Sequence, residues 1–323
     1  MISTVVGSFP LSNNKNDLSF KNKILTKFAN DSYKNDIKFS VESQLNAGID
    51  IISDGQVRGD MVELFLDFIP GFKKDGNTFY LKSKITKPQN PLRVKDLKIA
   101  IKYMNDYLNS NNNLKKYNKE EIDKKGVKGI ITGPSTLIQS SKIGNIYKNQ
   151  ELAILDLAEV LKYEAIALEN AGAKMIQIDE PFLSTGLLDV NTAKKAISIM
   201  SEEINIPFAI HCCGDIKDIF KDLTSFNVDI IDCEFAGNPC NFDFLNGNAK
   251  YLDGKKIGLG VIDTSNPKIE SVEEIVQTIE KGIAIVGENN LLIDPDCGMK
   301  MLSEEIAFKK LENMVKAIKT FNS

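Results

Sequence analysis

Short apolar segments rich in β-branched residues recur along this 323-residue chain, and most of them precede a loop and a helical pattern. The eight segments are residues 4–7, 49–53, 129–132, 175–178, 208–210, 229–233, 257–262 and 291–293. Apolar residues at the three-and-four spacing of amphipathic helices cover residues 152–171, 190–204, 272–286 and 304–321. Strands that alternate with helices form parallel sheets. Eight such units favour an α/β fold, a single closed (β/α)₈ barrel over residues 1–323.

Composition argues against several other classes of protein. The Gly-x-Gly-x-x-Gly fingerprint of an open dinucleotide-binding sheet is absent. A formal net charge of −4 gives no general affinity for nucleic acid. There is neither a basic leader nor an 18-residue apolar run, so we expect a cytoplasmic protein with no membrane partner. Five cysteines are too few for a disulfide scaffold in a chain of this length, and we expect reduced thiols.

Residues 61–128 separate the second and third segments and are too numerous for one barrel helix. They contain Pro70, Pro88 and Pro91, so they predict an insertion within the barrel. We expect a hairpin at residues 78–85 and a helix at residues 94–108. The insertion could be a solvent-exposed surface segment or a lid over the substrate, and both are compatible with this pattern.

The only histidine of the chain, His211, ends an apolar run and is followed by Cys212, Cys213 and Gly214. Side chains alternate along a strand, so His211 and Cys213 project together while Cys212 points the other way. The alternative interpretation is a buried core histidine beside two small buried cysteines. An imidazole and a thiol on the same strand face are otherwise typical of a metal site.

In a barrel of this type the active site lies at the carboxyl ends of the strands. Closure would bring the fifth, sixth and eighth segments around one mouth, with His211, Cys213, Glu234 and Cys297 at a common centre. Nitrogen, sulfur and oxygen ligands together suit Zn²⁺, whereas thiolates argue against Mg²⁺ or Ca²⁺. Metal coordination deprotonates a bound thiol, so the chemistry indicated is activation of a substrate sulfur as a nucleophile. Glu234 is the ligand that exchanges most readily, and it would give way to the incoming thiol.

Seven motifs then resemble, in order, the catalytic barrel of cobalamin-independent methionine synthases, in the short archaeal core form. They are Val6-Gly7-Ser8-Phe9-Pro10, Gly59-Asp60-Met61-Val62, Thr132-Gly133-Pro134, Ile178-Asp179-Glu180-Pro181, His211-x-Cys213, Glu234 and Asp294-Pro295-Asp296-Cys297-Gly298-Met299-Lys300. The resemblance implies that one zinc ion is bound by His211, Cys213, Glu234 and Cys297. It also implies that homocysteine thiolate attacks a methyl group to form methionine. Ser8 would hold the substrate carboxylate and Asp179 its ammonium group.

Two departures from that family concern the methyl donor. Ser140 stands where the long enzymes have a tryptophan thought to stack on folate, and Ser265 stands where they have a candidate proton-donating histidine. A methyl group on pterin N5 leaves poorly unless the nitrogen is protonated, and a general acid is worth about 10²- to 10⁴-fold. A methyl-corrinoid needs no such proton. We therefore expect methylcobalamin or a methyl-corrinoid protein as donor, with a methyl-tetrahydropterin or methyl-folate as the alternative.

A third departure is Gln56, which stands where the long enzymes place a glutamate near the substrate ammonium. Without that charge the site attracts an ammonium group less strongly, so a different thiol substrate, such as coenzyme M, is also compatible with it. Ser8 and Asp179 favour an amino acid as the substrate. Two further interpretations of the function remain. The protein could be a zinc-binding partner that delivers a corrinoid without catalysing a reaction, or it could belong to the metal-free decarboxylase branch of the same superfamily. Arg58 and Lys300 either contact an anionic donor or line the rim.

The remaining cysteines and acidic residues receive more modest assignments. Cys212 and Cys233 are expected to pack against the helices, and Cys240 to lie in an exposed loop. Glu180 and Asp296 are expected either to touch substrate or to hold the ligands in place from behind.

Overall fold

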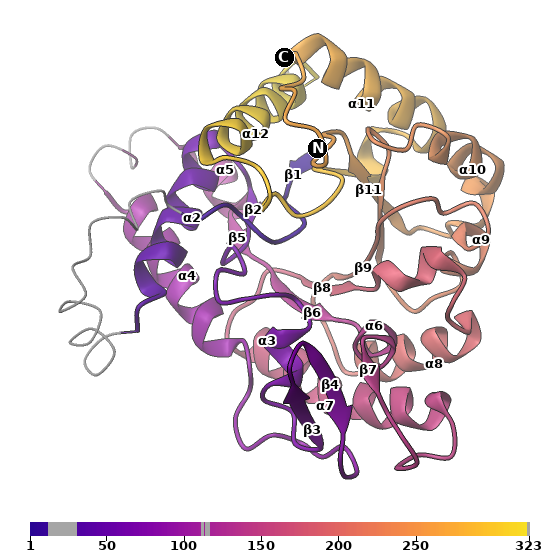
Figure 1. Ribbon diagram of the computed structural model, residues 1–323. Coiled ribbons are helices and arrows are strands. Elements are labelled where there is room, and N and C mark those ends of the chain that lie inside the picture. The colour runs from indigo at the N-terminus through magenta and orange to yellow at the C-terminus, as the bar shows by residue number, and fades with distance from the viewer. Residues whose placement is uncertain (12–30, 111–112, 114–116, 322–323) are drawn as a thin grey trace.

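A seven-stranded parallel sheet forms the centre of the computed structural model, which describes residues 1–11, 31–110, 113 and 117–321. The strands, in spatial order, are β1 (Ile2–Ser3), β12 (Leu291–Asp294), β11 (Lys256–Gly260), β10 (Ile230–Glu234), β9 (Phe208–Cys212), β8 (Ile176–Asp179) and β6 (Gly129–Thr132). Every neighbouring pair is parallel. The sheet curves, with helices around its outer side (Figure 1). Its strand carboxyl ends therefore share one edge.

A second, two-stranded parallel sheet pairs β2 (Ile51–Ile52) with β5 (Gly126–Val127). Isolated parallel bridges join Thr4 to Ile51 and Ser8 to Gly55, and β5 runs almost directly into β6. The pair thus connects the two edges of the seven-stranded sheet, β1 and β6.

Seven of the eight predicted segments overlap an observed strand, whereas the first, at residues 4–7, follows β1. The reason is that side chains bind this stretch of backbone. The carbonyl of Val6 accepts from Gln177 Nε2 at 2.7 Å, and that of Gly7 accepts from Ser53 Oγ at 2.5 Å. These groups are satisfied without a strand ladder.

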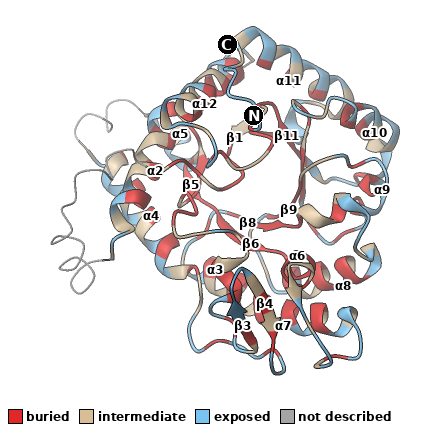
Figure 2. Cartoon of the chain, viewed as in Figure 1, coloured by how far each residue is buried: buried red, intermediate tan, exposed pale blue. Residues whose placement is uncertain are grey.

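The helices follow the amphipathic pattern of the sequence. Four predicted helices are confirmed with shifted or identical ends: α7 (Gln150–Asn170), α8 (Val190–Ser201), α11 (Val272–Val286) and α12 (Glu304–Lys319). The other α-helices are α2 (Lys34–Ala47), α3 (Glu63–Leu66), α4 (Val94–Leu108), α5 (Lys119–Lys124), α6 (Pro134–Gln139), α9 (Phe220–Leu223) and α10 (Asn241–Asn248). The 3₁₀ helices are η2 (Pro181–Thr185), η3 (Ala249–Tyr251) and η4 (Glu288–Asn290). In the long helices, such as α7 and α12, buried residues line the face toward the sheet, and the outer face is largely exposed (Figure 2).

Residues between β2 and β5 form the expected helix, α4, and a hairpin that the sequence misplaced. The hairpin pairs β3 (Phe72–Asp75) with β4 (Thr78–Leu81) and not residues 78–85. Gly76 adopts φ 56° in its turn, a conformation that glycine allows at no steric cost. β4 also pairs in parallel with β7 (Ser141–Lys142), which ties the hairpin to the loop after β6.

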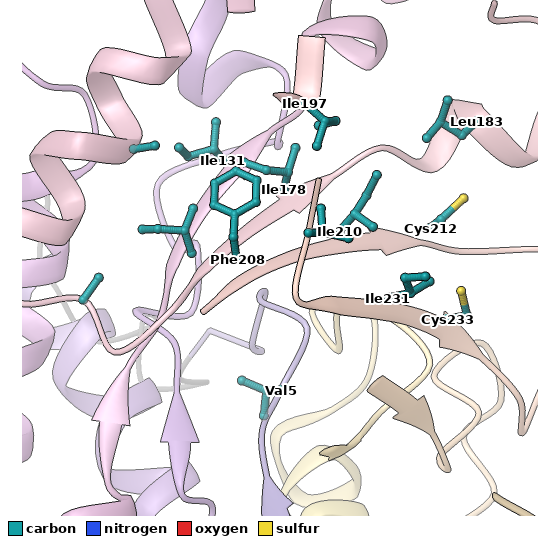
Figure 3. Packing of buried hydrophobic residues seen from close by; sticks show 14 of the residues in the cluster. Val5, Ile131, Ile178, Leu183, Ile197, Phe208, Ile210, Cys212, Ile231 and Cys233 are labelled. Atoms are coloured by element: carbon teal, nitrogen blue, oxygen red, sulfur yellow. The ribbon is translucent and has the colours of Figure 1, made fainter. Parts of the chain in front are cut away.

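The core lies between the sheet and the helices. Ile178, Ile210 and Ile231 project from neighbouring strands into this layer, together with Cys212 and Cys233 (Figure 3). Residues one position along these strands consequently face the opposite side of the sheet, away from the helices. None of the described helices is both long enough and apolar enough to cross a membrane.

Candidate metal centre

Three of the four predicted metal ligands come together at the carboxyl edge of the sheet. His211 lies on β9, Cys213 follows that strand directly, and Cys297 lies in the loop after β12. One ligand atom from each of the three lies within 4.8 Å of the other two. His211 is buried, and the cysteines are partly exposed. This is the spacing that a single ion needs.

The donor atoms also fit zinc chemically. Neither ring nitrogen of His211 has a hydrogen-bond partner in the described chain, although the residue is only 2% exposed. A buried ring nitrogen without a hydrogen bond is costly, and a metal ion would satisfy Nε2, while Nδ1 lies 3.3 Å from Asp232 Oδ1. One nitrogen and two sulfurs are ligands that zinc accepts in a tetrahedral site, which leaves a fourth position open.

Of the three residues, Cys297 is the one whose thiolate form is favoured, even without a metal ion. The hydrogen bond from Cys213, assisted by His211, lowers the pKa of Cys297 to about 4 even though burial opposes it. The same hydrogen bond, together with burial, raises the pKa of Cys213. Burial disfavours a charged His211, but Asp232 and the two thiols outweigh it and raise the pKa of the imidazole. A bound metal would replace these protons.

Glu234, the fourth predicted ligand, lies at the end of β10 but outside the group of three. Its Oε2 accepts a hydrogen bond from Asn238 Nδ2. Burial raises the pKa of Glu234, and the charge of Cys297 adds to this effect. The carboxylate is thus close enough to feel the site electrostatically, and its role as a ligand stays a prediction.

Asp296 connects the loop that follows Glu234 to its own loop, which carries Cys297. Its carboxylate accepts from the backbone N–H groups of Phe235, Ala236 and Gly237, at 2.9, 3.1 and 2.6 Å. A Cβ atom on Gly260 would lie 2.3 Å from Asp296 Oδ1, so only glycine leaves room for this arrangement. Asp296 therefore holds the two loops at a fixed separation.

Glu180 has a comparable structural position after β8. It is fully buried and accepts from Ser135 N, Thr136 N and Thr136 Oγ at 2.9, 2.8 and 2.7 Å. A Cβ atom on Gly133 would lie 2.2 Å from its Cδ. Of the two predicted roles, these contacts favour holding the first turn of α6 over touching substrate.

A cavity of about 230 Å³ lies directly over the group. Its lining comprises Val6, Ser8, Gln56, Gly59, Asp60, Met61, Asp179, Pro181, His211, Cys213, Cys297, Gly298, Lys300 and Met301. The predicted substrate contacts Ser8, Gln56 and Asp179 therefore share one small cavity with the predicted metal ligands His211, Cys213 and Cys297. A Cβ atom on Gly298 would lie 2.2 Å from Ser8 Oγ, so the backbone approaches this hydroxyl closely.

Asp179 is held from below by two residues that the sequence did not single out. Gln177 Nε2 donates to Asp179 Oδ1 at 2.6 Å, and Lys128 Nζ donates to Gln177 Oε1 at 2.6 Å. Burial raises the pKa of Asp179 to about 7. A lysine between two apolar strand segments was the available signal, since such a residue is rarely buried without a polar partner.

The rim residues divide into two groups. Arg58 forms ion pairs with Asp31 and Asp96 and lines a separate groove. These ion pairs hold its side chain outside the cavity over His211, Cys213 and Cys297. Lys300 lines the cavity, and its Nζ donates to the carbonyl of Gly59 at 2.9 Å. Cys240 is exposed, as expected.

Comparisons with known proteins agree with the motifs of the sequence. The methionine synthase of Methanothermobacter thermautotrophicus is 44% identical over 320 residues, which cover 98% of this chain and 99% of the relative. The methionine synthase of Methanocaldococcus jannaschii is 42% identical over 331 residues and covers 99% of both chains. The structure of a B12-independent methionine synthase from Shewanella sp. W3-18-1 in complex with selenomethionine matches with a TM-score of 0.81 at 23% identity, over 99% of this chain and 97% of that one.

That structural match supports the fold alone, since its sequence identity is low. The sequence model of the cobalamin-independent synthase catalytic domain matches residues 1–320, and so confirms the resemblance. The chain belongs to the cobalamin-independent synthase family, and its matched region is their catalytic domain.

Proposed function

We propose that this protein is a zinc-dependent methyltransferase that methylates the thiol of homocysteine to form methionine. The observation that carries the proposal is the group of His211, Cys213 and Cys297, whose ligand atoms lie within 4.8 Å of one another. The ion would be held by these residues, with Glu234 in the fourth position until the substrate thiol replaces it. Zinc would supply a stabilised thiolate at neutral pH. Relatives of nearly equal length carry the name methionine synthase, which supports this reading.

The other cavity residues would fix the amino-acid end of homocysteine. Ser8 provides a hydroxyl for the carboxylate, and Asp179 provides a carboxylate for the ammonium group. Gln56 is buried and lines the same cavity, where its amide oxygen can accept from the ammonium. An amino acid fixed in this way would have its thiol directed toward the ligand group.

We also infer that the seven-stranded sheet, the β2–β5 pair and the bridges from Thr4 and Ser8 close into one (β/α)₈ barrel. On this reading residues 61–128 are an insertion within a single catalytic domain. Closure accounts for the convergence on one cavity of side chains from β8 and β9 and from the segments that follow β1 and β12.

For the methyl donor we propose methylcobalamin or a methyl-corrinoid protein. Ser265 directs its Oγ to Asp263 Oδ1 at 2.6 Å, so this position offers no group that protonates a pterin nitrogen. The chain also has no tryptophan on which a pterin could stack. The donor proposal rests on two positions: Ser265, and Ser140 at the place of the missing tryptophan. It runs against the name of the family, which is called cobalamin-independent. The alternative is a methyl-tetrahydropterin or methyl-folate donor.

The direct test is to incubate the purified protein with methylcobalamin and homocysteine, with and without a chelator. We expect methionine to form, to stop forming after chelation and to form again when zinc is restored. A parallel reaction with coenzyme M compares the two thiols. Methionine formation that survives complete zinc removal would exclude the proposal. Zinc binding without turnover with any methyl donor would favour the corrinoid-handling partner, and a metal-free protein would favour the decarboxylase branch.

A further inference from the structure

Asp232 lies inside the barrel, one strand away from His211. It is the register partner of His211 across β10 and β9, and it is only 2% exposed. Its neighbours Ile231 and Cys233 pack against the helices, so Asp232 faces the interior (Figure 3). A Cβ atom on Gly258 would lie 2.7 Å from Asp232 Cβ. The glycine on β11 therefore makes the space that the aspartate occupies.

The carboxylate of Asp232 faces one particular nitrogen of the imidazole. His211 Nδ1 lies 3.3 Å from Asp232 Oδ1, slightly beyond ordinary hydrogen-bond length. With Nδ1 turned toward a carboxylate, Nε2 is the nitrogen left for a metal. Histidines that bind metals usually donate their other N–H to a carboxylate or carbonyl, which fixes the tautomer and the ring orientation.

We propose that Asp232 is the positioning residue of the metal centre, which holds His211 with Nε2 directed at the ion. The inference rests on the proposed zinc site and adds to it a residue outside the ligand set. Asp232 would act through His211 and would touch neither the metal nor the substrate.

The surroundings of Asp232 leave its carboxylate available for this task. Asp232 Oδ1 has no hydrogen-bond partner in the described chain, and neither does either carboxylate oxygen of Asp294, which is also buried. Burial, and then the charge of Asp232, raise the pKa of Asp294 well above its usual range. The nearby ammonium group of Lys128 donates to Gln177. Lys128 therefore does not compete with the imidazole for Asp232 Oδ1.

Asp232 also matters to the metal-free protein, where it lies 3.3 Å from the buried imidazole. Removing one member of a buried pair is destabilising, so D232A is expected to melt at a lower temperature than the wild type. Melting temperature therefore does not separate a positioning role from a structural one. Zinc affinity does, because a residue kept only for stability would leave the affinity of the folded protein unchanged, whereas we expect this affinity to fall in D232A.

Zinc affinity is measured on the full chain by competition with a chromophoric chelator. We expect D232A to bind zinc about 10- to 100-fold more weakly, the usual effect of removing such an outer partner. D232N keeps an oxygen that can accept from Nδ1–H, so its loss should be smaller. D229N is the matched control. Asp229 accepts from Phe208 N at 2.8 Å and joins the same two strands at their far end. Its replacement should not alter zinc affinity.

The outcomes distinguish this inference from the proposed function. Wild-type zinc affinity in both Asp232 variants would overturn the positioning role while leaving the metal site intact. An equal loss of affinity in D229N would overturn it as well, since the effect would then be general. If C297S also retained wild-type affinity, the proposed metal site itself would be wrong. Should D232A fail to fold, D232N decides by the same measurement.

Discussion

Replacing Cys297 with serine is expected to reduce methyl transfer to homocysteine by about 10³-fold or more. A metal ion contributes several kcal/mol to the stabilisation of developing charge, and each 1.36 kcal/mol is a factor of ten in rate. Serine removes one of the two sulfurs of the ligand group, and its hydroxyl is a poor ligand for zinc at neutral pH. Initial rates with saturating methyl donor and homocysteine, together with the zinc content of the variant, measure both parts of the effect.

The matched control is Cys240→Ser, because Cys240 is exposed and lies outside the ligand group. It should retain wild-type zinc content and rate. If C297S turned over as fast as the wild type, the thiol would have no part in catalysis. If C297S lost zinc but kept the wild-type rate, zinc would have no role in methyl transfer. Cys297 would still be one of the zinc ligands.

Methylcobalamin is expected to support turnover about 10²- to 10⁴-fold faster than methyl-tetrahydrofolate, the range that a general acid contributes. The pterin nitrogen leaves as an amine and needs a proton, whereas a corrinoid departs as a stable cobalt centre. Ser265 is exposed and hydrogen-bonded to Asp263, and it cannot act as that acid. Initial rates with each donor at saturating homocysteine measure the ratio.

Ser265→His provides an internal comparison. It restores a proton donor beside Asp263, so it should raise the rate with methyl-tetrahydrofolate and leave the rate with methylcobalamin unchanged. Equal rates with the two donors in the wild-type protein would refute the corrinoid proposal, while the homocysteine reaction itself would stand.

The strands, the long helices and the ligand group were predictable because each rests on a local pattern. Periodicity fixes which residues form strands and helices, and the carboxyl ends of parallel strands always share one edge. His211, Cys213 and Cys297 lie at or just beyond these ends and come together as predicted, whereas Glu234, predicted by the same reasoning, lies outside the group. Cys212 and Cys233 were predicted to face the helices from alternation alone, and both are confirmed in the core.

The parts that the sequence missed depend on contacts between distant segments. The hairpin at β3 and β4 is an exception, because its register is set by a local turn at Gly76 that the hydrophobic pattern does not reveal. Gln177 and Asp232 lie in apolar strands and Lys128 lies between two of them, and only the curved arrangement of the strands brings these residues near the site. Arg58 was left open as a donor contact, and the structure pairs it with Asp31 and Asp96.

X-ray absorption at the zinc K-edge tests the central claim most directly, because it counts the sulfur neighbours of the ion in solution. We predict about one zinc per chain, with two sulfur ligands at about 2.3 Å and nitrogen or oxygen in the remaining positions. Addition of homocysteine should raise the number of sulfur ligands to three as the substrate thiolate binds. A sulfur count that homocysteine leaves unchanged, or a protein that retains no zinc, would contradict the account.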